Sequence, residues 1–243
     1  MYKKSNMSRW FSGLGNVFLI AMMLVSSVGL DVTSVSAAPA GTALQFNGSN
    51  QYVTFGNTRL TPGTLTNGPT WNTLANSRLG SSSLTLNSTT ANQYVTFGAA
   101  PELGTTNFTI ETWFYRTGAG SGTDTSGVGG GGLQGAIPLL TKGRGEGDYT
   151  NVDMNYFLGI SSTGRIAADF EDMTAVSPNP NNHAIIGTTA LSNNTWYHAA
   201  ATFDGSTFSV YLNGNLEASV ATTAVPRWNS IQHSGLATGL TST

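Results

Sequence analysis

The chain has 243 residues, and charged residues make up 9% of it, against about 25% in ordinary soluble domains. A net charge of −2, with no basic run after residue 40, excludes a typical nucleic-acid-binding protein, whose affinity rests on clustered Lys and Arg. The absence of cysteine excludes disulfides, thiol catalysis and cysteine-bound metals.

The first forty residues have the pattern of a secretory signal peptide. Three basic residues precede a nine-residue apolar run at residues 17–25, and small residues follow it. The run is shorter than the ~20 apolar residues that a membrane-spanning helix needs. We therefore predict that residues 1–40 are a signal peptide cleaved after Ala37 or Ala40. The mature protein is then secreted or held at the cell surface, with no membrane span after cleavage.

A seven-residue sequence, NQYVTFG, occurs twice. It stands at residues 50–56 and again, unchanged, at residues 92–98. Because this spacing occurs only once, it indicates duplication of a strand and not a solenoid. We predict that residues 41–62 are a duplicated edge-strand segment. Either copy fits the same strand position, and we favour the second, which leads directly into the next predicted strand.

From residue 108 onward the sequence alternates with the period of two that is typical of strands. The predicted strands cover residues 108–115, 156–160, 165–170, 197–203, 207–212 and 215–220. Asp204-Gly205 and Asn213-Gly214 separate the last three, and both dipeptides favour the positive φ of tight hairpin turns. The glycine-rich residues 118–135 predict an exposed loop. No convincing helical period follows residue 40, so the pattern predicts a β-sandwich or barrel.

Several stretches resemble the laminin-G-like family of concanavalin-like jelly-roll domains. Residues 108–114, FTIETWF, are similar to one of its core strands, and the most specific match is TWYHAAATFDG at residues 195–205 followed by VYLNG at 210–214. The resemblance implies an all-β, two-sheet antiparallel jelly-roll sandwich. It also implies binding of glycans or proteins outside the cell, in some members through calcium. The family's usual closing strand is missing, so we expect residues 63–243 to be a laminin-G-like domain lacking its final strand, within a larger modular protein.

Acidic residues are scarce but gather in one region, where they are Glu146, Asp148, Asp153, Asp169, Glu171 and Asp172. A hairpin of residues 156–160 and 165–170 would bring its open ends together. Asp153 would then lie near Asp169, Glu171 and Asp172. We predict these four as metal ligands, with calcium preferred to magnesium because calcium takes 6–8 oxygen ligands. The other interpretation, which the sequence favours, is a solvated acidic rim, partly neutralised by Lys142 and Arg144.

Other candidate chemistry is weaker. Sandwich glycosidases place paired acids on one strand in a Glu-x-Asp-x-(x)-Glu pattern. Residues 169–172, DFED, do not reproduce it, so we predict that the protein is not an enzyme. Glu111, Trp113 and Tyr115 share one face of a strand, which would suit sugar stacking if that face met solvent. Because this strand lies in the core of the resembled family, we expect a structural role for them, as for His198.

These observations favour an extracellular recognition module that binds a glycan or protein surface, with calcium as the predicted cation. The first alternative is a structural or adhesive unit of a larger cell-surface protein. The less favoured alternative is a sandwich-fold glycoside hydrolase.

Overall fold

The computed structural model describes residues 62–73, 78, 82–87, 91–126, 131–146, 151–173 and 181–242. The signal peptide predicted over residues 1–40 and the first copy of the repeat lie outside these residues. Within them the one helical element is a turn of 3-10 helix, Pro101–Leu103. No helix in the described part is long and apolar enough to cross a membrane.

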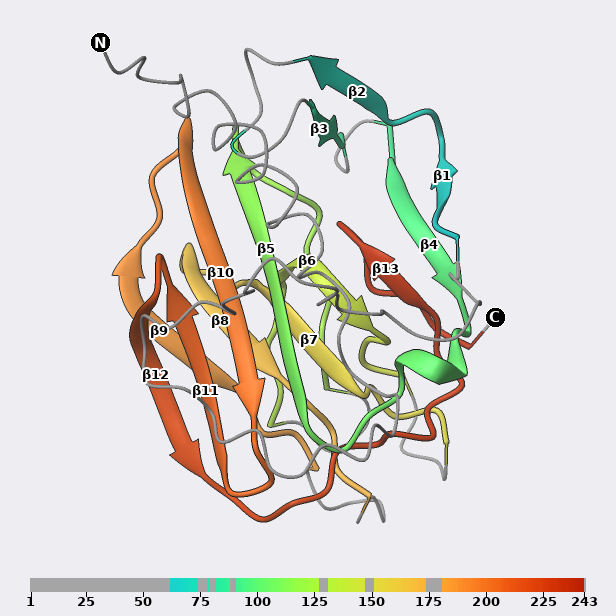
Figure 1. Cartoon of the computed structure of the whole chain (residues 1–243), viewed down its shortest axis with the longest axis vertical. Helices are drawn as coiled ribbons and strands as arrows, with labels where there is room; N and C mark the ends of the chain where they lie inside the picture. Colours follow the sequence, from blue (N-terminus) through green and yellow to red (C-terminus); the bar gives the residue numbers. More distant parts are fainter. Residues whose placement is uncertain are drawn as a thin grey trace, which may run out of the picture.

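Two antiparallel sheets packed face to face form the body of the molecule (Figure 1). The seven-stranded sheet has the order β1 (Thr64–Thr66), β4 (Tyr94–Gly98), β13 (Ser234–Leu236), β6 (Ile137–Lys142), β7 (Tyr156–Ile160), β8 (Arg165–Asp169), β9 (Ile185–Ala190). The four-stranded sheet has the order β12 (Asn215–Ala221), β11 (Thr207–Leu212), β10 (Thr195–Phe203), β5 (Phe108–Arg116). A short ribbon of β2 (Thr70–Thr73) and β3 (Ser82–Thr85) completes the described strands. The predicted two-sheet antiparallel jelly-roll sandwich is confirmed.

The predicted hairpins form where the turn chemistry places them. β7 and β8 pair with Ile160 opposite Ile166, and Gly164 in the turn has a φ of 74°. In the turn between β11 and β12, Asn213 and Gly214 have φ values of 51° and 80°, the left-handed conformation that a tight hairpin turn requires. The strand β13, which sequence analysis did not predict, lies between β4 and β6.

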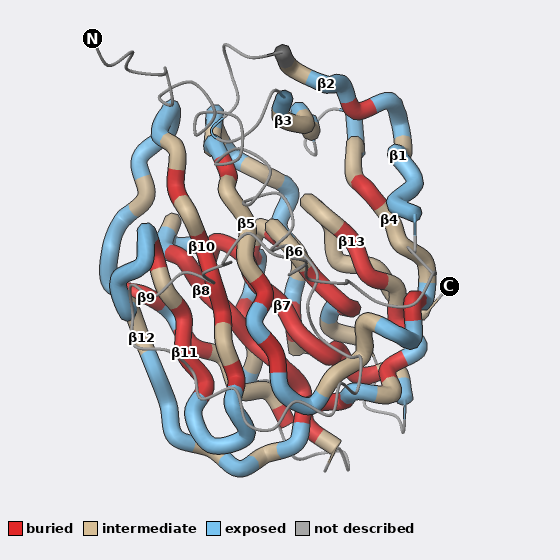
Figure 2. Tube along the Cα trace, viewed as in Figure 1, coloured by how far each residue is buried: buried red, intermediate tan, exposed pale blue. Residues whose placement is uncertain are grey.

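The hydrophobic core lies between the two sheets, where the tube in Figure 2 is coloured as buried. Alternate residues of β5, including Phe108, Ile110 and Phe114, point into it, as their spacing predicts. Phe170, just after β8, is fully buried and lies 5.1 Å from Phe203, centroid to centroid. The residues between the inward-facing ones on β5 and β10 therefore lie on the outer face of the four-stranded sheet.

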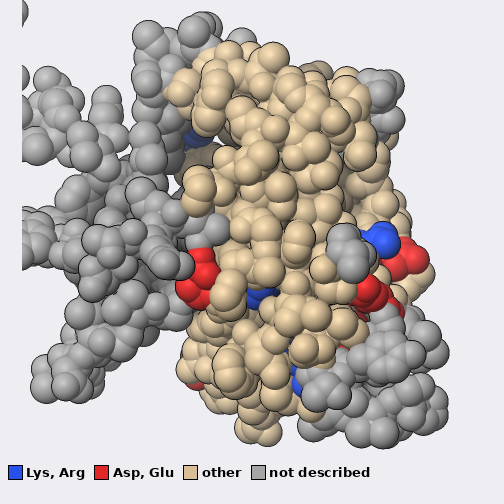
Figure 3. Space-filling model, turned by 90° about the vertical axis from the view of Figure 1, so that its right-hand side faces the viewer, with Lys and Arg blue, Asp and Glu red and all other residues tan. Residues whose placement is uncertain are grey.

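Glu217 on β12 ties the two sheets together along one side. Its carboxylate accepts hydrogen bonds from the backbone N–H groups of Thr188 and Thr189 on β9, both at 2.8 Å. The hydroxyl of Thr189 donates a further bond of 2.7 Å. Elsewhere charged side chains are sparse, and uncharged residues cover most of the described surface drawn in Figure 3.

Most described residues of the glycine-rich loop are exposed or half-buried, as expected, but two of them anchor the loop in the body. Thr125 is fully buried and Leu133 is 5% exposed. The Thr125 N–H donates to the Leu133 carbonyl at 2.9 Å, and the Leu133 N–H donates to the Thr125 hydroxyl at 2.7 Å. A Cβ at Gly122 would lie 2.6 Å from the Gly135 carbonyl oxygen, so close packing requires glycine there.

Candidate functional site

The four carboxylates predicted as metal ligands are all buried. Asp153 and Glu171 are each 1% exposed, Asp169 is fully buried and Asp172 is 7% exposed. The β7–β8 hairpin forms as expected and places the segments that carry these acids at its open end. The alternative of a solvated acidic rim is wrong, because these side chains face the interior and not the solvent.

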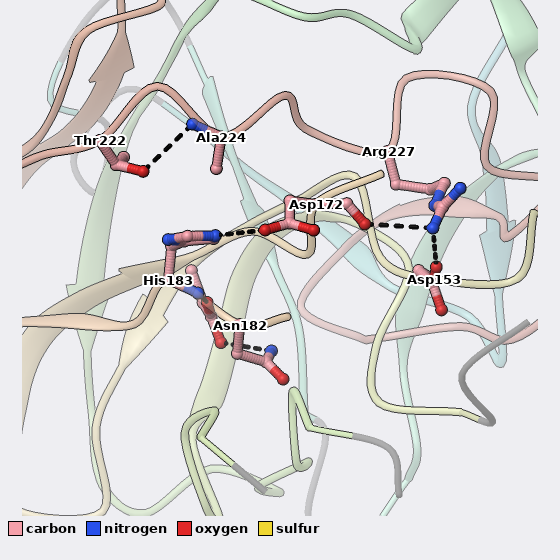
Figure 4. Close-up of polar contacts among 8 residues, drawn as sticks. Asp153, Asp172, Asn182, His183, Thr222, Ala224 and Arg227 are labelled. Carbon is pink, nitrogen blue, oxygen red and sulfur yellow. Dashed lines mark hydrogen bonds and ion pairs between the residues drawn. The ribbon is translucent and has the colours of Figure 1, made fainter. Parts of the chain in front are cut away.

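Arg227, which no sequence pattern singled out, is the counter-charge of this network (Figure 4). Its guanidinium forms an ion pair of 2.6 Å with Asp153 and donates a hydrogen bond of 3.1 Å to the Asp172 carbonyl. The Arg227 N–H donates to the Glu171 carbonyl at 2.8 Å. One arginine thus connects Asp153 to the backbone that carries two of the other acids.

The remaining carboxylates have protein donors of their own. Asp172 lies 2.8 Å from His183 Nε2, and this contact is also drawn in Figure 4. Glu171 accepts a short hydrogen bond from the Met154 N–H. The imidazole of His183 stacks on the ring of Phe170 at a centroid distance of 4.5 Å. Asp172 and Glu171 therefore each have a protein partner.

Asp169 holds the glycine-rich loop against β8. It accepts hydrogen bonds from the Thr125 hydroxyl at 2.5 Å, from Asn182 Nδ2 at 2.9 Å and from the His183 N–H at 2.9 Å. Asn182 also donates to the Thr125 carbonyl at 3.0 Å. A single buried carboxylate therefore joins three segments that are distant in the sequence.

This arrangement does not resemble a calcium cage. Calcium needs 6–8 oxygen ligands that point at one position, and the described residues contain no group of three His, Cys, Asp or Glu side chains arranged to hold a metal. Lys142, expected to neutralise the acids, instead donates to the carbonyls of Ala99 and Gln232. Glu146 accepts from Gln232 and Ser242, and Asp148 lies outside the described residues. Calcium binding by Asp153, Asp169, Glu171 and Asp172 stays a prediction.

Burial raises the pKa of Asp169 to about 6, although its hydrogen bonds to Thr125, Asn182 and His183 oppose that rise. A carboxyl whose pKa is higher in the folded than in the unfolded state stabilises the fold at low pH, and this stabilisation is lost as the pH rises. We expect the loss between about pH 4 and pH 6, with a size of about 3 kcal/mol.

Urea unfolding at several pH values tests this expectation, with Asp169→Asn as the reference because asparagine keeps an acceptor and does not titrate. The free energy of unfolding of the wild type, minus that of Asp169→Asn, should fall as the pH rises from 4 to 6 and then stay level. If the free energies of unfolding of the wild type and Asp169→Asn changed in parallel with pH, the raised pKa of Asp169 would be contradicted.

A second group of candidate residues lies on the outer face of the four-stranded sheet. Trp113 and Tyr115 on β5 stand opposite His198 and Trp196 on β10. The Tyr115 and Trp196 rings are 5.3 Å apart, and the Trp113 and His198 rings are 5.2 Å apart. Tyr115 is 43% exposed. The expectation that this face of β5 is core is therefore wrong, because the opposite face carries the core residues.

Polar groups adjoin these rings. His198 Nε2 lies 3.2 Å from Glu111, and both side chains are about one-fifth exposed. The guanidinium of Arg78 lies 4.9 Å from the centroid of the Trp113 ring, a cation–π contact. On the same face, Ala200 pairs with Glu111 of β5 on one side and with Tyr211 of β11 on the other. Its small side chain stands between the acid and the ring.

Hydroxyl groups form the next row across the same face. Thr109, Thr202, Ser209 and Ser219 stand opposite one another across all four strands. Along the strands the outer face thus passes from aromatic rings through the Glu111–His198 pair to hydroxyls. We call the residues Glu111, Trp113, Tyr115, Trp196, His198 and Tyr211 the outer aromatic face. It combines flat apolar surface with a few fixed polar groups, as ligand-binding sites do.

The two packed sheets form a concanavalin-like jelly-roll sandwich. The chain belongs to the concanavalin A-like lectin/glucanases superfamily, whose sequence profile matches residues 88–237. A comparison with curated protein sequences finds no match.

Solved structures with a similar chain path include bacterial carbohydrate-related domains. Domain 4 of AbnA, a GH43 extracellular arabinanase from Geobacillus stearothermophilus in complex with arabinotriose, is 12% identical, with a TM-score of 0.46 and 74% of each chain covered. The CBM40 of the Ruminococcus gnavus IT-sialidase is 14% identical, with a TM-score of 0.40, over 56% of this chain and 66% of that one. The carbohydrate-binding module CBM66 from Bacillus subtilis is 13% identical, with a TM-score of 0.33, over 73% of this chain and 92% of that one.

Proposed function

We propose that the protein is an extracellular recognition module that binds a glycan on its outer aromatic face. The observation that carries the proposal is the adjacent pair of Tyr115 and Trp196 rings, with the Glu111–His198 pair beside it on the same sheet. The signal peptide predicted over residues 1–40 and the low content of charged residues support the extracellular setting.

A sugar ring presents a face of C–H groups and a rim of hydroxyls. The rings of Tyr115 and Trp196 offer flat apolar surface against which C–H groups pack, and such rings lose little conformational freedom on binding. Glu111, His198 and the hydroxyls of that row that are not buried offer acceptors and donors for the rim. Because these groups stand on paired strands, they are held in place before a ligand arrives.

A hydrolase is less well supported on this face. Hydrolysis of a glycosidic bond needs two carboxyl groups on either side of the bond. Glu111 is the single acidic residue in strands β5, β10 and β11. We therefore propose binding without catalysis, with a protein ligand as the second candidate because exposed aromatic residues also anchor protein interfaces.

Binding of the full mature chain to an array of immobilised oligosaccharides, followed by titration calorimetry with the strongest binder, tests the proposal. Trp196→Ala should weaken binding about tenfold or more, since the stacking surface is lost. Trp228→Ala is the matched control: Trp228 is 48% exposed but lies in the loop before β13, and its loss should leave the affinity unchanged.

Wild-type affinity in Trp196→Ala would place the ligand elsewhere on the domain. Failure of the wild type to bind any oligosaccharide would favour the structural or adhesive unit. Repeating the titration in calcium and then in excess chelator tests the calcium prediction with the same material.

A further inference from the structure

A β-bulge in β12 places Leu216 on the outer face of the four-stranded sheet. Val210 of β11 stands opposite Ala218 of β12. The next residue of β11, Tyr211, stands opposite Leu216, so Glu217 is an extra residue in β12. Because Tyr211 belongs to the outer face, the residue opposite it lies there too, and Leu216 is 57% exposed.

The bulge is fixed by contacts with the other sheet. The hydrogen bonds from the Thr188 and Thr189 N–H groups direct the Glu217 carboxylate toward β9. In an unbulged strand, alternation would place Leu216 on the inner face together with Ala218. The exposed leucine beside Tyr211 therefore results from the bulge, a feature that often re-aims side chains beside functional sites.

Leu216 completes a row of side chains that crosses all four strands. Glu111 of β5 pairs with Ala200 of β10, and Ala200 pairs with Tyr211 of β11. Tyr211 in turn pairs with Leu216 of β12, and its side chain is partly exposed. The row thus has a polar end at Glu111 and an apolar end formed by Tyr211 and Leu216.

This apolar end lies well away from the pair of Tyr115 and Trp196 rings that carries the proposed function. Ala200 follows Trp196 by four residues on β10, which corresponds to about 13 Å along the strand, and β11 lies about 5 Å to its side. No single sugar ring covers that distance. The row of Trp113 and His198 lies between the two ends.

We propose that Tyr211 and Leu216 form a second contact region and that the protein binds a linear glycan of several residues along its outer face. This inference rests on the proposed function and names the class of glycan. One sugar ring packs on Tyr115 and Trp196, and another packs on Tyr211 and Leu216. A short sugar reaches only the first region, so the affinity rises with chain length.

Titration calorimetry of the full mature chain with matched disaccharides and hexasaccharides tests the proposal. The probes are cello-, xylo- and manno-oligosaccharides, together with both lengths of the strongest binder on the array. We expect the hexasaccharide to bind about tenfold more tightly than the disaccharide, or better, because it gains a second set of apolar contacts. Tyr211→Ala and Leu216→Ala should each remove most of that gain and leave the disaccharide affinity unchanged, whereas Trp196→Ala should weaken both.

Val220→Ala is the matched control for these variants. Val220 lies on the same strand and is 40% exposed, but it stands opposite the core residue Phe208 and so faces away from the outer aromatic face. Its replacement should change neither affinity.

The outcomes separate this inference from the proposed function. Equal wild-type affinities for both lengths, with binding still weakened by Trp196→Ala, would overturn the second contact region and leave the proposed function standing. Equal losses for both lengths in Tyr211→Ala and Leu216→Ala would also overturn the second region, since the two residues would then act on the first. Failure of every oligosaccharide to bind would overturn both proposals.

Discussion

Replacing Arg227 with methionine is expected to lower the free energy of unfolding by about 3–5 kcal/mol. The guanidinium and the Asp153 carboxylate are 3% and 1% exposed, and they form an ion pair of 2.6 Å. Methionine fills a similar volume but removes the positive charge from a buried acid, whose solvation water is already lost. Urea unfolding at pH 7 measures the loss.

A double-mutant cycle separates this ion pair from the rest of the network. Asp153→Leu combined with Arg227→Met removes both charges, so the double variant should be more stable than the sum of the two single losses predicts. Strict additivity of the single losses would show that Asp153 and Arg227 contribute independently. Because Arg227 also donates to the Asp172 carbonyl, we expect the double variant to remain less stable than the wild type.

Replacing Phe170 with alanine is expected to cost about 3–5 kcal/mol. The side chain is fully buried between the sheets, 5.0 Å from the ring of Phe208 and 5.1 Å from that of Phe203, centroid to centroid. Loss of the ring leaves a cavity that paired strands on both sides prevent from closing. Guanidinium unfolding of the purified chain measures the change.

Phe170→Leu and Trp71→Ala are the matched controls for this prediction. Leucine keeps part of the volume, so its cost should be clearly smaller than that of alanine. Trp71 is 64% exposed, and its replacement should change stability by no more than about 0.5 kcal/mol. A cost for Phe170→Ala similar to that for Trp71→Ala would contradict the central place of Phe170 in the core.

Much of the fold was predictable because its determinants are local. The alternation in residues 108–115 identified the strand that forms β5, and the Asn213-Gly214 dipeptide identified a turn whose φ values are positive. The alternation also assigned Phe108 and Ile110 to one face of the strand and Glu111 and Trp113 to the other, which is correct. Which of the two faces meets solvent depends on the other sheet, which packs on only one of them.

The candidate site was less predictable because its determinants are distant in the sequence. That the segments carrying Asp153, Asp169, Glu171 and Asp172 lie at the open end of one hairpin follows from the pairing of β7 with β8, which the sequence indicated. The donors that hold them, Thr125 for Asp169 and Arg227 for Asp153, arrive from segments that share no local pattern with the acids.

The sequence by itself therefore determined the class of fold, the positions of seven of the thirteen described strands, several of the turns between them and the hairpin beside which the acids lie. Those features depend on side-chain alternation and on residues that accept positive φ, which act within a few residues of chain. The tertiary structure alone decided that the carboxylates are buried among protein donors and that the aromatic side of β5 is the outer one. Burial and pairing depend on which distant surfaces pack together, and the packing of one sheet against the other fixes both.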